Sequence, residues 1–305
     1  MVNKVSICIP SFNRKQHLLN TLKAIIVESH DIDFIDEIIL IDDGYSSTDR
    51  DEIISEMQSY QKFRYHKSGS SGSFGDVYLE CMKAAKTNYV LITYDDDVLF
   101  TQNLEKSLVA RYDNDWSVVV PVWLSQKNRL LRGSKRKTHI IKPLKLLRYM
   151  AHAPGIIYNK DSCQNELKVL ANRLSKDCLL SKMYPQVLLA ALLIDGGKTI
   201  ISSPNIIGKD GLGLPTEIKT PDGDDYFSLR ARLNQYLSLI EIDDAQILNN
   251  DTIQNLRSEY FARILIEQSH NITVTAFLFY CKRTLTMQYR VCRHKLKNKL
   301  MRIFN

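Results

Sequence analysis

The chain has 305 residues, of which 44% are hydrophobic and 25% charged, an ordinary composition for a globular protein with a large core. No apolar run reaches the roughly eighteen residues of a membrane-spanning helix, and the run near the N-terminus is too short for a secretory signal. The six cysteines form no Cys-x-x-Cys pair, which argues against a zinc site and favours reduced thiols in the cytoplasm.

The net charge of +7 conceals an uneven distribution. Residues 127–148 contain nine Lys or Arg, residues 280–305 contain eight, and neither segment contains an acidic residue. The rest of the chain is acidic, so the asymmetry predicts two local contacts with something anionic. No recognisable nucleic-acid-binding motif accompanies the basic segments, and nucleic acid is therefore not expected as a partner.

The first hundred residues alternate between strand and helix patterns. We expect strands at 4–9, 37–41, 63–66 and 89–94, with Pro10 ending the first, and helices at 15–29, from about 48 onward, and at 74–86. This alternation predicts an α/β fold with a Rossmann-like, mostly parallel central sheet flanked by helices. Ligands of such sheets bind beyond the carboxyl ends of the strands, here 10–13, 42–44, 68–75 and 95–97.

Three consecutive aspartates, Asp95, Asp96 and Asp97, follow the fourth expected strand. Like charges so close together need a compensating cation or a solvated loop. If the chain stays extended, Asp95 and Asp97 point the same way and could share one Mg²⁺ or Mn²⁺ that carries a nucleotide diphosphate. A solvated, aspartate-rich turn is the alternative.

A family resemblance rests on three motifs in order: Ile-Pro-Ser-Phe-Asn-Arg at 9–14, Ile-Asp-Asp-Gly-Tyr-Ser-Ser-Thr-Asp at 41–49, and the aspartate triplet. Over residues 4–125 the chain resembles the family-2 glycosyltransferases of GT-A fold, and the triplet after Ile-Thr-Tyr is similar to the abequosyltransferase type of bacterial O-antigen synthesis. The resemblance implies an inverting, metal-assisted transfer from a UDP-, CDP-, GDP- or dTDP-sugar. The implied acceptor is a lipid-linked oligosaccharide or polysaccharide in O-antigen or capsule synthesis.

The resemblance also assigns donor-binding roles. The base pocket would be lined by Pro10, Phe12 and Arg14, with Asp42 accepting a hydrogen bond from the base and Asp43 shaping the turn. Asp97 would ligate Mn²⁺ or Mg²⁺ directly, and Asp95, next to Asp96, would contact the ribose or the metal. The Gly/Ser loop around Gly72 and the following Asp76 would approach the base or ribose. A turn that merely precedes a helix, and a flexible linker, are the alternatives for Asp42–Asp43 and for the Gly/Ser loop.

An inverting transfer needs a base that takes the proton of the acceptor hydroxyl. Asp177 stands about eighty residues beyond the triplet, ahead of a helical pattern at 184–194, which resembles the family's placement of this base. Lys176 replaces the usual Glu before it, and a surface ion pair is the alternative. His152, in a segment similar to the family's acceptor side where Gly155 would leave room for a sugar, is a second candidate, with a structural role as the alternative.

The two basic segments have open interpretations. Residues 127–148, with Arg129, Arg132, Lys135, Arg136 and Lys137, form either a mobile loop that closes over a diphosphate or a solvated loop. The tail 281–305 follows a helical pattern at 252–279, and its basic and apolar residues suit an anionic membrane surface. Packing on the body and a tail-mediated homo-oligomer are the alternatives.

We therefore expect a GT-A catalytic domain at 1–215, with a nucleotide-binding half at 1–125 and an acceptor-side half at 126–215. A helical C-terminal region would occupy 216–305. The protein would be cytoplasmic and peripheral on the inner face of the plasma membrane. Two rival functions remain open: a nucleotidyltransferase, although its glycine-rich first loop is missing, and a non-catalytic, transferase-like scaffold of a polysaccharide assembly complex.

Overall fold

The computed structural model describes residues 4–69, 73–108, 116–135, 137–176, 178–211, 235–239, 242 and 247–267, with side chains as far as 260. Contacts divide the chain into two units, Met1–Tyr260 and Phe261–Asn305, and the first contains the sheet and the candidate site. The domain boundary expected near residue 215 and the basic tail lie outside the described residues, so both stay predictions.

The N-terminal half alternates strands and helices as the sequence predicts. The apolar side chains of β1 and β2 are buried, and those of the edge strand β3 are half-buried, because helices cover both faces of the sheet. Its elements are β1 (Val5–Ser11), α1 (Lys15–Ser29), β2 (Ile35–Asp42), α2 (Ser47–Met57), β3 (Phe63–Lys67), α3 (Phe74–Ala84) and β4 (Tyr89–Ile92).

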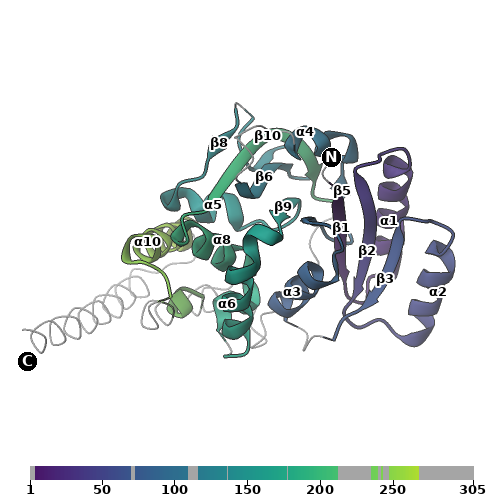
Figure 1. Ribbon diagram of the computed structural model, residues 1–305, viewed down its shortest axis with the longest axis horizontal. Coiled ribbons are helices and arrows are strands. Elements are labelled where there is room, and N and C mark those ends of the chain that lie inside the picture. The colour runs from purple at the N-terminus through teal and green to yellow at the C-terminus, as the bar shows by residue number, and fades with distance from the viewer. Residues whose placement is uncertain are drawn as a thin grey trace, which may run out of the picture. The chain divides into compact units, whose positions relative to one another are not determined.

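The order of these strands sets the position of the ligand edge. They lie in the order β3-β2-β1-β4 and all pair in parallel, so the chain reverses its direction of winding between β1 and β4. Right-handed crossovers then place α1 and α2 on one face and α3 on the other, as Figure 1 shows. The edge beyond the carboxyl ends of β1 and β4 is the switch point at which such sheets bind ligands.

The second half of the sheet is mixed rather than parallel. Strand β9 pairs antiparallel with both β4 and β6, and β6 pairs in parallel with β10, so β10 runs in the same direction as β4. The elements are β5 (Val98–Leu99), α4 (Leu104–Leu108), β6 (Trp116–Leu124), β7 (Leu130–Arg132), β8 (His139–Ile140), α5 (Leu146–Met150), β9 (Ile156–Asn159), α6 (Gln164–Leu174), α7 (Leu179–Met183), α8 (Pro185–Asp195), β10 (Thr199–Lys209) and α10 (Asn250–Glu267). Short 3-10 turns occupy Thr101–Asn103, Pro143–Lys145 and Asp161–Cys163.

The expected end of the first strand at Pro10 is wrong, because β1 continues through Pro10 to Ser11. The strand tolerates the missing proline N–H here because β4 pairs with β1 only as far as Cys8, so beyond that residue β1 has a strand partner on one side alone. The two additional residues carry Ser11 to the ligand edge.

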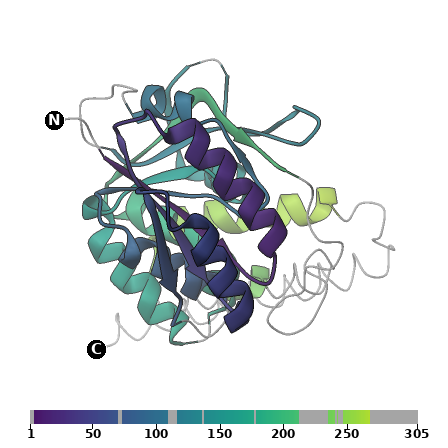
Figure 2. The same cartoon turned by 90° about the vertical axis from the view of Figure 1, so that its right-hand side faces the viewer.

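The helical layers follow from amphipathic sequence patterns. α1 buries Leu18, Leu22 and Ile25 in the main apolar core, and α8 is buried along almost its whole length. Figure 2 shows α1 and α2 on the side of the sheet that faces the viewer. Within the described residues no helix is long and apolar enough to cross a membrane, and the four described cysteines are buried and free of disulfides.

Candidate functional site

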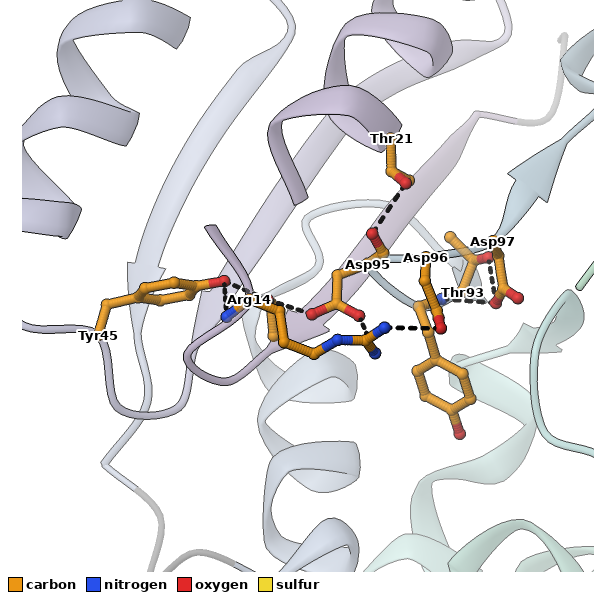
Figure 3. A network of polar contacts seen from close by, with 9 residues as sticks. Arg14, Thr21, Tyr45, Thr93, Asp95, Asp96 and Asp97 are labelled. Atoms are coloured by element: carbon orange, nitrogen blue, oxygen red, sulfur yellow. Dashed lines mark hydrogen bonds and ion pairs between the residues drawn. The ribbon is translucent and has the colours of Figure 1, made fainter. Parts of the chain in front are cut away.

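The aspartate triplet lies in a turn at the carboxyl end of β4. The backbone N–H of Asp97 donates to the carbonyl of Tyr94 at 3.3 Å, which folds the chain back before β5. Residues 95–97 therefore form the turn that was the alternative to an extended chain, and the carboxylates of Asp95 and Asp97 point in different directions, as Figure 3 shows. Asp95 and Asp97 alone therefore do not form the shared metal site that an extended chain would have allowed.

Arg14 binds two of the three aspartates. Its Nη1 donates to Asp95 at 2.9 Å and its Nη2 to Asp96 at 2.8 Å (Figure 3). The Oγ of Ser11 donates to the other Asp95 oxygen at 2.5 Å, and the Thr21 hydroxyl donates to the Asp95 carbonyl at 2.8 Å. The charge of Arg14 thus neutralises carboxylates that would otherwise repel each other, and its expected place in the base pocket stays a prediction.

Asp95 remains hard to ionise despite this partner. Burial raises the pKa of its carboxyl, the Ser11 hydrogen bond and the Arg14 charge lower it, and the Asp96 charge raises it again; the pKa stays above its usual value. The hydroxyl of Tyr45 lies 2.5 Å from Ser11 Oγ and accepts from the Arg14 backbone N–H at 3.1 Å. The Tyr45 hydroxyl therefore connects the second loop to the first through Ser11 and Arg14.

Asp97 is buried as well, with 7% of its surface accessible. Its Oδ2 accepts from the Tyr94 N–H at 3.0 Å and from the Thr93 hydroxyl at 3.3 Å. Burial raises the pKa of Asp97 well above its usual value, and the negative charges of Asp96 and Asp210 add to the effect. No cation of the described residues bonds to it, so a bound cation would relieve this cost.

Asp210 brings a second carboxylate to the same place, and it was not among the residues singled out from the sequence. It follows β10, whose carboxyl end lies at the same edge as that of β4 because the two strands run in the same direction. A Cβ added at Gly211 would overlap the Asp96 carbonyl, which shows how closely this segment lies against the triplet. The triplet was singled out because it follows the carboxyl end of a strand. Asp210 would have been found in the same way had the strand at 199–209 been recognised.

His152 and Trp123 hold Asp210 in place. Trp123 Nε1 donates to Asp210 Oδ1 at 2.9 Å, and His152 Nε2 lies 3.1 Å from the same oxygen. Burial would raise the pKa of Asp210, but the hydrogen bond and charge of His152 and the hydrogen bond of Trp123 leave it below its usual value. The structure thus gives His152 a carboxylate partner, the arrangement that orients a histidine in general acid–base catalysis.

Two glycines make room for the Trp123 ring. A Cβ at Gly155 or at Gly208 would lie 2.4 Å from that ring, and Gly155 has a φ of +71°. The space at Gly155 that the sequence reserved for a sugar is therefore filled by an indole. Asp177, the first candidate base, lies outside the described residues, so its role stays a prediction.

Asp42 organises the second loop. One oxygen accepts from the N–H groups of Gly44 and Tyr45, and the other accepts from Arg50 Nε at 3.0 Å and from the Tyr65 hydroxyl at 2.6 Å. Burial would raise the pKa of Asp42, but these four hydrogen bonds lower it below its usual value. An added bond from a nucleotide base requires one of the four donors to move.

The other residues that were expected to contact the nucleotide lie at the same edge of the sheet. Phe12 is 58% exposed, and its ring covers Gly44, which has a φ of +142° that favours glycine. Pro10 lies inside β1, and Asp43 donates its backbone N–H to the Ser11 carbonyl at 3.1 Å. An apolar ring left in solvent at a ligand edge is available to stack on a base.

The loop before α3 is organised as a helix cap. Ser73 accepts from the Asp76 N–H at 3.2 Å, and the Ser73 hydroxyl donates to the Asp76 carboxylate. This pairing satisfies the first turn of α3. The expected contact of Asp76 with the nucleotide stays a prediction. Gly72 lies outside the described residues.

A divalent metal would find carboxylates here but not a complete site. In the portion of the chain that is described, no group of three or more His, Cys, Asp or Glu side chains is arranged to hold a metal ion. Asp97 and Asp210 supply oxygen donors from two different segments, and Mg²⁺ and Mn²⁺ commonly complete their coordination with water and phosphate oxygens. The donor set therefore fits a metal that arrives together with a diphosphate.

Comparison with known proteins identifies the family and the fold of the chain. A profile described as glycosyl transferase family 2 matches residues 6–165. The structure of S. aureus TarS 1-349 in complex with UDP-GlcNAc is similar with a TM-score of 0.61 and 15% identity, covering 89% of this chain and 77% of that one. The mannosyltransferase PcManGT from Pyrobaculum calidifontis, in complex with GDP-Man and Mn²⁺, has a TM-score of 0.52 and 11% identity over 96% of this chain and 83% of that one. No curated protein sequence matches the chain. The fold is that of the GT-A glycosyltransferases.

Proposed function

The chain belongs to glycosyl transferase family 2, and we propose that it transfers a sugar from a nucleotide-diphosphate sugar to a hydroxyl acceptor with the help of Mn²⁺ or Mg²⁺. The observation that carries this proposal is that the segment of Asp210 and Gly211 lies against the triplet, close enough for the Asp210 charge to act on Asp97, beside the Arg14-bound aspartates at the switch point of the sheet. Two structures of similar fold were determined with UDP-GlcNAc and with GDP-Man and Mn²⁺, which supports a donor of this class.

The residues at this edge of the sheet would have different roles in the reaction. Asp97 and Asp210 would hold the metal, which when bound neutralises the charge that develops on the departing diphosphate. Phe12 would cover the base. Arg14 keeps Asp95 and Asp96 ordered at the ribose side of this edge, because its two ion pairs fix the turn between β4 and β5.

The proton of the acceptor hydroxyl needs a base in an inverting transfer. His152 is one base candidate, since Asp210 bonds to its Nε2 and would stabilise the charged ring; the proton would have to be taken at Nδ1, which is a buried atom, so the acceptor would have to reach it there. Asp177 is the second candidate. Loss of activity in Asp177→Asn but not in His152→Gln would assign the base to Asp177.

The finer assignments extend this proposal. We infer a lipid-linked oligosaccharide or polysaccharide as the acceptor, in O-antigen or capsule synthesis of the abequosyltransferase type, and a basic C-terminal tail that binds an anionic membrane surface peripherally. The support is the sequence resemblance and the charge of residues 280–305. The family match favours glycosyl transfer over the rival nucleotidyltransferase.

A donor screen tests the proposal. The protein is incubated with UDP-, CDP-, GDP- and dTDP-sugars and Mn²⁺, and release of the nucleoside diphosphate is measured together with the shift in melting temperature. We expect one nucleotide class to raise the melting temperature and to be hydrolysed slowly in a metal-dependent way. Asp97→Ala should abolish turnover, while Asp36→Ala, which removes an exposed aspartate from β2, should not. Absence of binding and of hydrolysis for all four classes would favour the scaffold.

A further inference from the structure

Arg132 is a buried cation beneath the proposed site. It belongs to the basic segment 127–148, in which the other described Lys and Arg side chains are exposed, yet only 1% of its own surface is accessible. The expectation that Arg132 belongs to a mobile or solvated loop is therefore wrong. It lies in β7 opposite Trp123 of β6, and this pairing turns its side chain inward.

The guanidinium connects two segments of the site through backbone carbonyls. Its Nη1 donates to the carbonyls of His152 at 2.6 Å and Pro154 at 2.5 Å, and its Nε donates to Pro121 at 3.3 Å. Its Cζ lies 5.7 Å from the centre of the Trp123 ring, within reach of a cation–π interaction. Arg132 thus holds the ring of Trp123 and the backbone carbonyl of His152. These are the two residues whose side chains contact Asp210.

This cation forms no salt bridge within the described chain, and its buried Nη2 has no hydrogen-bond acceptor there. Burial lowers the pKa of Arg132 to about 10, so it stays charged at neutral pH. The acidic groups whose charges act on it are Asp97 and Asp210, with the hydroxyls of Tyr94 and Tyr158 also close. A buried guanidinium with an unused N–H is costly, which makes a purely structural role a poor explanation for it.

We propose that Arg132 is a positioning residue for the reaction, which aligns Asp210 through Trp123 and His152 and places a fixed positive charge behind the two carboxylates. This inference rests on the proposed function. The fixed charge opposes binding of a free cation at Asp97 and Asp210 and favours binding of a pyrophosphate anion. The site would therefore bind metal weakly by itself and recruit it together with the nucleotide.

Two binding measurements on the full chain test the role of the charge. Arg132→Met removes the charge at similar length, and Mn²⁺ alone is titrated by electron paramagnetic resonance while inorganic pyrophosphate is titrated in EDTA by calorimetry. We expect Mn²⁺ to bind about tenfold more tightly and pyrophosphate about tenfold more weakly, the order expected for charges several ångströms apart in a protein interior. Lys106→Met, which removes an exposed cation from α4, should change neither affinity.

The opposite signs are the diagnostic result, because a merely structural loss would weaken both ligands together. Equal weakening of both, or no change in either, would overturn the inference. If the wild-type protein binds neither Mn²⁺ nor pyrophosphate, the proposed function fails first; if it binds both and Arg132→Met matches it, only this inference fails.

Arg132→Lys provides a second test that does not depend on the folding of the methionine variant. Lysine keeps the charge but cannot serve three carbonyls in the fork geometry of a guanidinium. We expect both affinities to stay within about threefold of wild type while kcat falls about tenfold at an unchanged donor KM, because the charge is kept but the His152 segment, whose carbonyl Arg132 binds, loses its alignment. An unchanged kcat would contradict the positioning role.

Discussion

Replacing Arg14 by methionine should cost the protein stability in proportion to the burial of Asp95. The side chain of Asp95 is 5% exposed and that of Arg14 is 27% exposed, with 2.9 Å between their charged atoms. Removing one partner of a buried ion pair costs about 3–5 kcal/mol, and the partial exposure of Arg14 places this case near the lower end, at about 3 kcal/mol. For a chain of this size that corresponds to a drop in melting temperature of roughly 6–12 °C.

The assay is thermal unfolding of four proteins: wild type, Arg14→Met, Asp95→Asn and the double variant. Asp95→Asn in the Arg14→Met background should restore much of the lost stability, because it removes the uncompensated charge. The loss should also shrink toward pH 4, where the Asp95 carboxyl takes up a proton, since its pKa lies above the usual value. Lys15→Met, which breaks exposed ion pairs to Asp49 and Glu52, is the matched control and should have little effect.

A melting temperature of Arg14→Met within about 1 °C of wild type would refute the reasoning, because a loss of only 1 kcal/mol would already lower it by more than that. It would also be refuted if Asp95→Asn restored nothing. Either result would mean that the carboxylates are solvated and that Arg14 is free to line the base pocket.

Three further predictions concern other parts of the site. Asp97→Asn should abolish transfer. In EDTA it should raise the melting temperature at neutral pH but not at pH 4. The raised native pKa of Asp97 makes the stability of the wild type fall as pH rises above about 4, and asparagine removes that loss. Asp42 has a lowered native pKa, so its stabilisation of the fold is present above about pH 4 and is lost as pH falls through the native pKa. The difference in melting temperature between wild type and Asp42→Asn should therefore narrow in acid. A difference that widened would contradict a lowered native pKa. Ser73→Ala should remove the cap of α3 at a cost of about 1 kcal/mol, seen as a melting temperature lower by roughly 2–4 °C, with the donor KM unchanged.

The fold of the first hundred residues was largely predictable, because strand and helix periods alternate there and each apolar run is buried. α1 and β3 begin where the patterns predict, and the carboxyl ends of β1 to β4 meet at one edge. The mixed second half was not predictable in the same way. β9 is four residues long and its direction depends on pairing with β4 and β6, which no local pattern in the sequence specifies.

The candidate site was predictable in composition but not in contacts. The triplet was found from its place after a strand, yet the turn at 95–97 and the Arg14 pairs depend on side chains that approach from other loops. Asp210 and Arg132 were missed as site residues for the same reason: a buried arginine in a basic segment cannot be told from its exposed neighbours without the pairing of β7 with β6.

Binding of Mn²⁺ in the presence of a nucleoside diphosphate tests the central claim most directly. Electron paramagnetic resonance would count the bound metal in the wild-type protein, in Asp97→Asn and in Asp210→Asn, with Asp36→Asn as the control. We predict one site in the wild type and in the control that is lost in both of the other variants. Undiminished Mn²⁺ binding by Asp97→Asn and Asp210→Asn would contradict the assignment of the metal and the diphosphate to this edge of the sheet.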